Sequence, residues 1–379
     1  MTQKITYQAA RTVAAAVEDH FARHLAAARE RGEHALAPAP RARAIEAIID
    51  AAFWASLLRE EGRSPKISLA YLPPQQAEQP MQFERWLQLT PGVLTKLAPA
   101  VERPGIHLGV WCEDDVLYVW GATRAIPSLS FVLEVVEPGL LVVKHRRISG
   151  YGKFANVAVL KGEQVKVVDG NATTLSDSSD LLTSMLGFTT ASASSRDRGA
   201  NVLIQLAVSM RDHGRGGSLL IVPAGTQSWQ QSIIHPIPYA VDPAFGGLAD
   251  LIKQGEHECQ WRGDLERAVD GIAGLTAVDG ATVISDQYEL LAFGAKIGRP
   301  EGNAPVMQIV TTEPIVGGGA VVVHPAQSGG TRHLSAAQFV HDQRDALALV
   351  ASQDGRFTVF AWSPTQEMVH AHRIDSLLL

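Results

Sequence analysis

Asp279, Gly280 and Ala281 stand where a helical pattern over residues 260–276 gives way to the strand-like TVISD. Ligands collect at strand ends in α/β sheets, and glycine lets a ligand approach the backbone closely. A carboxylate in this place has the chemistry to bind a divalent metal or to orient an attacking hydroxyl. A simple Asp-Gly turn explains the same residues without any function.

A second polar segment, Gly329-Gly330-Thr331-Arg332-His333, comes just before another expected helix. The two glycines leave backbone N–H groups accessible, and a helix start adds open donors and positive partial charge. Thr331 contributes a hydroxyl and Arg332 a permanent cation with two parallel donors. This combination indicates a phosphate cradle, and the alternative is a capped helix start with a surface arginine.

The third segment, Ser352-Gln353-Asp354-Gly355, follows the apolar strand DALALVA. We expect Ser352 to lie at the same sheet edge as the other two segments. A hairpin turn between DALALVA and RFTVFAW explains these residues equally well.

Several widespread motifs are absent from the sequence. It has no GxxxxGKS/T loop, no GxGxxG between a strand and a helix, no GxSxG and no HExxH. These absences exclude a standard P-loop, a dinucleotide fingerprint, a nucleophile elbow and a zincin site.

In this order and spacing, the three segments resemble the diadenylate cyclase domain, and the resemblance extends from about residue 180 to 363. DGATVISDQYELLAFGAKI is similar to the family's Asp-Gly-Ala region, and GGTRHLSAAQFVHDQRDALALVASQDGRFTVF to its phosphate-binding helix and serine strand. HGRGGSLLIVP is similar to its first core strand. The resemblance implies condensation of two ATP molecules to cyclic di-AMP with release of two pyrophosphates. It also implies Mg²⁺ or Mn²⁺ as cofactor and a homo-oligomer with catalytic domains face to face.

The same resemblance implies roles for individual residues. Asp279 would bind the metal or help to activate the 3′-hydroxyl, and Thr331, Arg332 and His333 would hold the triphosphate. The remaining residues would contact the nucleotide: Gly280, Ala281, Gly330 and Ser352. On this basis the expected catalytic residues are Asp279, Arg332 and His333.

The chain departs from the family pattern at two positions. The family's second arginine is Leu334 here, which removes a phosphate-binding cation, and its acidic residue after the serine is Gln353, with Asp354 next along. The cations that we consider as substitutes are Lys296, Arg299 and Arg344. The segment 223–245 is longer than a minimal connection and indicates a divergent branch of the family.

The chain before these motifs has a different pattern. Two amphipathic helices are expected within residues 8–34 and 45–57, separated by APAP, and short β-branched strands with tight turns follow from about residue 105 to 168. The polar segment DGNATTLSDSSD at 169–180 predicts a linker. We therefore expect an α/β chain, α+β overall. Residues 1–168 would form helices with a small antiparallel β-meander, and residues 181–379 a mixed β-sheet flanked by helices.

The N-terminal part resembles sensor-like modules that accompany such cyclase domains, with a ligand that the sequence does not name. Trp111, Tyr118 and Trp120 either line a pocket or, as we favour, pack in the core. The formal net charge of −6 over 379 residues gives no bias towards nucleic acid or anionic membrane. With two distant cysteines, no signal-peptide pattern and no span of about 18–20 apolar residues, we expect a cytoplasmic protein.

Two functional alternatives remain open at this point. The C-terminal part could be a degenerate domain that binds ATP or a cyclic nucleotide without turnover, as Leu334 and Gln353 suggest. It could also synthesise a different cyclic nucleotide, because the residues that would distinguish the base are not identifiable from the sequence.

Overall fold

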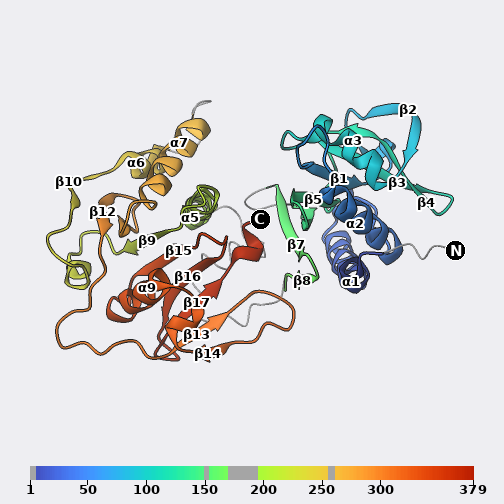
Figure 1. Cartoon of the computed structure of the whole chain (residues 1–379). Coiled ribbons are helices and arrows are strands. Elements are labelled where there is room, and N and C mark those ends of the chain that lie inside the picture. Colours follow the sequence, from blue (N-terminus) through green and yellow to red (C-terminus); the bar gives the residue numbers. More distant parts are fainter. Residues whose placement is uncertain (1–5, 149–152, 170–194, 255–260) are drawn as a thin grey trace. The chain divides into compact units, whose positions relative to one another are not determined.

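The structure is a computed structural model that describes residues 6–148, 153–169, 195–254 and 261–379, with backbone alone for 195–201. Its contacts divide the chain into two compact units, Met1–Asp169 with Leu379, and Gly170–Leu378. Apart from Asp169, the expected linker at 169–180 lies outside the described residues. Each unit contains a mixed sheet and helices (Figure 1), and the expected α+β fold is confirmed.

The first unit is an eight-stranded sheet in the order β2-β4-β3-β1-β5-β6-β7-β8. The strands are β1 Ile67–Tyr71, β2 Met81–Gln88, β3 His107–Glu113, β4 Val116–Thr123, β5 Phe131–Glu137, β6 Leu140–Arg146, β7 Phe154–Lys161 and β8 Gln164–Val167. The sheet is larger than the expected meander and includes one parallel pair, β1 with β3. The crossover that a parallel pair requires is made by β2 and α3, Pro91–Val101.

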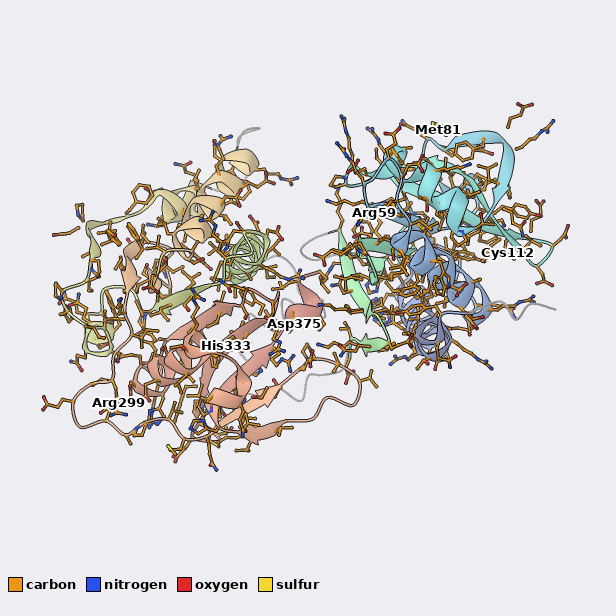
Figure 2. All side chains as sticks on the ribbon, in the orientation of Figure 1. Arg59, Met81, Cys112, Arg299, His333 and Asp375 are labelled. Atoms are coloured by element: carbon orange, nitrogen blue, oxygen red, sulfur yellow. The ribbon has the colours of Figure 1, made fainter. Side chains whose placement is uncertain are left out.

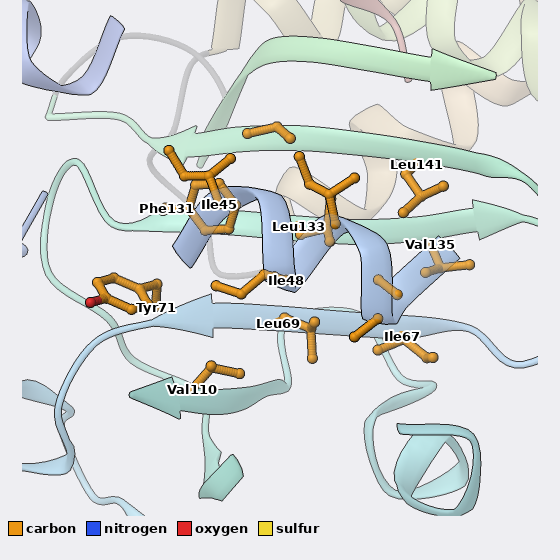
Figure 3. Close-up of a cluster of buried hydrophobic side chains, with 14 of the residues drawn as sticks. Ile45, Ile48, Ile67, Leu69, Tyr71, Val110, Phe131, Leu133, Val135 and Leu141 are labelled. Carbon is orange, nitrogen blue, oxygen red and sulfur yellow. The ribbon is translucent and has the colours of Figure 1, made fainter. Parts of the chain in front are cut away.

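Helices α1, Gln8–Glu30, and α2, Ala42–Leu57, cover one face of this sheet together with α3. Their apolar stripes meet the alternate strand residues that point to the same face. Figure 3 shows part of this core, where Ile45 and Ile48 of α2 lie against Leu69, Phe131 and Leu133. Burial of this face fixes the register of the strands, because a slip of one residue would move these apolar side chains to the opposite face of the sheet, away from the helices.

The second unit is a nine-stranded sheet in the order β10-β12-β11-β9-β15-β16-β17-β13-β14. Its strands are β9 Gly217–Val222, β10 Tyr239–Phe245, β11 Ala281–Ser285, β12 Leu290–Ala295, β13 Ile309–Thr312, β14 Val321–Val323, β15 Leu347–Ala351, β16 Phe357–Ser363 and β17 Met368–Arg373. The pairs β9–β11 and β13–β17 are parallel and the others antiparallel. This is the mixed sheet expected for the C-terminal part.

Helices cover the sheet of the second unit. They are α5 Ser195–Asp212, α6 Gly247–Gln254, α7 Trp261–Leu275, α8 Pro325–Ser328 and α9 Thr331–Asp342. Ala336, Ala337, Phe339 and Val340 of α9 are buried against β9, β15 and β16. Helix α7 leads into β11, and α9 leads into β15. The start of α9 is therefore held against the sheet by its own buried face.

Candidate functional site

Four neighbouring strands, β11, β9, β15 and β16, have their ends side by side on the nine-stranded sheet. We call this line of strand ends the edge of the sheet, as distinct from its outer strands. Ala281 at the start of β11 pairs with Ser218, and Gly217 at the start of β9 pairs with Ala351 at the end of β15. Ala351 in turn pairs with Phe357 at the start of β16. The Asp279 motif and the Ser352 turn therefore leave the sheet at the same edge, separated by the strand β9. Neighbouring strands lie about 4.8 Å apart, so β11 and β15 are about 10 Å apart across β9.

Asp279 lies at this edge in solvent, with 89% of its side chain exposed. Its carboxylate is 3.8 Å from the Nζ atom of Lys296, which follows β12. Of the three substitute cations proposed from the sequence, Lys296 is the one placed next to Asp279. An exposed carboxylate with one loose ion pair is accessible to a metal ion or a substrate hydroxyl.

Gly280 has a conformation and surroundings that suit glycine alone. Its φ is +110°, and a Cβ atom there would lie 2.5 Å from the carbonyl carbon of Gly294. Gly294 also has positive φ, at +62°, and the ring of Tyr239 occupies the place of its Cβ. The backbone beside Asp279 is therefore in close contact with β12, which fixes the place from which the Asp279 side chain leaves the sheet.

The phosphate-cradle segment forms the start of α9. Gly330 is the N-cap residue and Thr331, exposed, is the first helical residue. A guanidinium nitrogen of Arg332 lies 3.2 Å from the position that a Cβ of Gly216 would take, and the Ala351 carbonyl oxygen lies 3.2 Å from the same position. Arg332 thus lies where β9 begins and β15 ends. The structure brings Arg332 to the edge that carries Asp279 and Ser352.

His333 has a different placement from the one that the resemblance implies. Its ring is only 3% exposed, its Nε2 is 3.3 Å from Thr358 Oγ1, and it packs edge-on against Phe360. Burial lowers its pKa, so the ring is neutral at pH 7. A Cβ on Gly329 would collide with this ring. His333 holds the start of α9 on β16, and the exposed groups of this segment are Thr331 and Arg332.

Ser352 opens a tight turn between β15 and β16. Its N–H donates to the Arg356 carbonyl at 2.9 Å, and Gly355 N–H donates back to the Ser352 carbonyl at 3.1 Å. Desolvation raises the pKa of the Asp354 carboxyl, but hydrogen bonds from Ser352 and the Arg356 N–H outweigh it and hold that pKa below its usual value. Asp354 also pairs with Arg356, whose Nε atom lies 3.2 Å away.

Two cations at this edge were missed by the sequence analysis. Arg356 is the last residue before β16, and Arg215 precedes β9, where its carbonyl accepts a hydrogen bond from Gln353 Nε2 at 3.3 Å. Only the pairing of β9 with β15 and of β15 with β16 could have predicted their position. Each arginine lies in a turn that this pairing brings to the edge. Arg344, one of the substitute cations considered from the sequence, does not face this edge as a free cation. Its guanidinium stacks on Trp362, 4.1 Å from the ring centroid.

Arg299 lies on the loop after β12, exposed to solvent, and is labelled together with the buried His333 in Figure 2. Neighbouring Gly298 hydrogen bonds to Ser232, which also bonds Gln343 just after the end of α9. Arg299 therefore belongs near the far end of α9 and not with Arg332.

An aromatic pair adjoins Asp279 on the other side. Tyr239 of β10 stacks on Phe293 of β12 with ring centroids 4.6 Å apart and planes at 10°. Tyr239 is 50% exposed although it is a large aromatic residue. Its ring covers Gly294, and the Asp279 carbonyl oxygen is 3.5 Å from the Cβ position of that glycine. A half-exposed aromatic side chain therefore lies near the backbone of Asp279.

The described residues include no group of three or more His, Cys, Asp and Glu side chains that could hold a metal ion alone. Magnesium bound to nucleotides commonly takes one or two carboxylates and completes its shell with phosphate oxygens and water. Asp279 is accessible for such binding, so the donor set fits a metal that arrives with a nucleotide.

In the first unit, Trp120 is fully buried and donates from Nε1 to the Leu72 carbonyl at 2.8 Å. This confirms a core role for Trp120. Trp111 is half-buried and packs on Tyr71 with ring centroids 5.0 Å apart. Among the described residues, no helix has a stretch of the length and apolarity needed to cross a membrane.

Comparison with protein families gives one match, to a family described as probable sensor domain DACNV, over residues 34–124. The match includes α2, α3 and the strands β1 to β4 of the first unit. It covers less than a third of the chain. No curated protein matches the sequence.

Proposed function

We propose that this chain is a diadenylate cyclase whose activity is regulated by its first unit. The observation that carries the proposal is the meeting of Asp279, Arg332 and Ser352 at one edge of the nine-stranded sheet. These three segments come from distant parts of the sequence, and a carboxylate, an arginine at a helix start and a hydroxyl are the groups that phosphoryl transfer uses.

The arrangement suits a nucleotide that lies along this edge. Its phosphates would contact Arg332 and the start of α9, where charge-assisted hydrogen bonds are strong. Asp279 would hold the Mg²⁺ or Mn²⁺ ion, which neutralises phosphate charge when bound. The half-exposed ring of Tyr239 would stack on the base, since aromatic stacking accepts any base.

The reaction follows from the product of the resembling family. The 3′-oxygen of one ATP forms a bond to the α-phosphorus of a second ATP, the bond to pyrophosphate breaks, and the hydroxyl proton passes to solvent or to Asp279. A second identical step closes the ring. One edge holds one nucleotide, so the chemistry needs two copies of the chain with these edges facing. Positioning and charge neutralisation provide most of the rate enhancement in such reactions.

The match of residues 34–124 to a probable sensor domain supports regulation by the first unit. The ligand of that unit stays unidentified, and its effect on turnover is part of the proposal.

The test is to incubate the full chain with ATP and Mn²⁺ or Mg²⁺ and to identify the products by mass spectrometry. Asp279→Asn is the control, because the exposed side chain contributes little to folding. Cyclic di-AMP from the wild type alone supports the proposal. Formation of a different cyclic nucleotide would support the assigned site but show that the assigned product is wrong.

A binding domain without turnover is the second candidate. It is favoured by Leu334, which is exposed in the first turn of α9 and carries no charge. Tight ATP binding with no product, in the presence of either metal, favours this alternative.

A further inference from the structure

The phosphate side of the edge has fewer cations than the resemblance leads one to expect. In the first turn of α9, Arg332 is the cation, His333 is buried and neutral, and Leu334 is apolar. A triphosphate carries up to four negative charges, and one guanidinium with a helix start balances only part of them. Besides the metal ion and Lys296 next to Asp279, a further cation at the phosphates would come from another element of the same edge.

We infer that Arg356 is this cation and that it contacts the phosphates of the bound nucleotide together with Arg332. The inference rests on the proposed function and assigns a residue that the sequence motifs do not include. Arg356 immediately precedes β16, the strand on which the start of α9 lies, since Thr358 two residues further along contacts His333. It is exposed, so no reorganisation of the core is needed for it to meet a ligand.

The surroundings of Arg356 connect it to Arg332 through the paired turns. Ser352 N–H donates to the Arg356 carbonyl, and Gln353 contacts both the Arg215 carbonyl and the Gly216 site where the Arg332 guanidinium lies. The charges of Asp354 and Arg356 also act, in opposite directions, on the pKa of the buried His333. Arg332 and Arg356 therefore border the same small area of the edge.

Arg356 forms an ion pair with Asp354, with Nε and Oδ2 3.2 Å apart. Both side chains are about half exposed, so this ion pair is weak and screened by solvent. A phosphate group offers the guanidinium two strong acceptors and would replace Asp354. Asp354 thus competes with the nucleotide for Arg356, which gives the two residues opposite effects on binding.

The experiment measures ATP affinity by calorimetry for the full chain and four variants, in EDTA so that no metal bridges Asp354 to phosphate. Arg356→Ala should bind ATP about 10- to 100-fold more weakly, the range for a lost charge-assisted hydrogen bond. Arg356→Lys should recover part of this loss. Asp354→Asn should bind more tightly than wild type, by up to about 5-fold, as expected for removal of a surface ion pair. Arg299→Ala, which removes the same charge away from this edge, should match wild type.

The sign of the two effects separates phosphate binding from a structural role. If the ion pair only closes the turn, Arg356→Ala and Asp354→Asn weaken binding together, and the inference is overturned. Equal ATP affinity in Arg356→Ala and wild type also overturns it. If wild type binds ATP neither in EDTA nor with Mg²⁺, the proposed function itself fails, and the inference with it.

Discussion

Replacement of Gly280 by alanine should loosen the strand that positions Asp279. At φ +110°, an alanine carries backbone strain of about 1–3 kcal/mol. Its Cβ would lie 2.5 Å from the Gly294 carbonyl carbon, 2.6 Å from its oxygen and 2.9 Å from the Ala295 nitrogen. These are backbone atoms of a paired strand, so relief requires the β11–β12 pairing to shift, at about 1–3 kcal/mol as for overpacking.

Together the two costs amount to about 2–6 kcal/mol. The assay is amide hydrogen exchange of Ala281–Ser285 in the full chain, measured by mass spectrometry, because exchange reports the local opening free energy. A loss of 2 kcal/mol makes exchange about 30-fold faster. Gly271→Ala is the matched control, since this helical glycine has no neighbour within 4 Å of its Cβ position and alanine there should slightly stabilise α7. Exchange within 3-fold of wild type in Gly280→Ala would refute the reasoning from close approach.

Three further predictions concern the site and the first unit. Arg332→Ala should weaken ATP binding by about 10- to 100-fold with little change in thermal stability, because its guanidinium lies at the exposed edge; unchanged affinity by calorimetry would remove Arg332 from the site. Tyr239→Leu should weaken ATP binding by about 5- to 150-fold and Tyr239→Phe should not, while equal losses in both variants would show that stacking is not the cause. Burial lowers the pKa of His20 to about 2 and that of His145 to about 3, so both rings are neutral when folded and take up protons on unfolding below their ordinary pKa of 6.5. The first unit should therefore lose stability as pH falls from 6.5 towards 3, by up to about 1.4 kcal/mol per pH unit for each ring; a urea midpoint that stays constant between pH 6.5 and 4.5, followed by tryptophan fluorescence, would contradict this.

The sequence predicted the meeting of the site segments better than the orientation of their side chains. Strand-end reasoning placed Asp279, Arg332 and Ser352 at one edge, because strand polarity and helix starts are local properties. The inward ring of His333 was not predictable, since its burial depends on Thr358 and Phe360 of a later strand. Arg356 was missed for a related reason, as its place follows from the β15–β16 register.

In the first unit α1, α2 and the strands from β3 onward were predicted, but β1, β2 and α3 were not. The five residues of β1 lie directly before the turn-forming LPPQQ, which hides so short a strand. The eight residues of β2 are mostly exposed on both faces and show no alternation of apolar and polar residues. Without β1, the parallel pairing with β3 and the full width of the sheet could not be inferred.

The order of strands in the second sheet has a consequence for synthesis of the chain. Strand β9 lies between β11, which follows it after two helices, and β15, which comes near the end of the sequence. A nascent chain that has emerged only as far as β14 contains the Asp279 motif and Gly216 but lacks β15, so the backbone N–H and C=O groups on that side of β9 have no partner strand. Arg332 and Ser352 join the edge once α9 and β15 have left the ribosome. A polypeptide truncated before this point lacks Arg332, Ser352 and the strand that pairs with this side of β9, so under the proposed function it should not bind ATP.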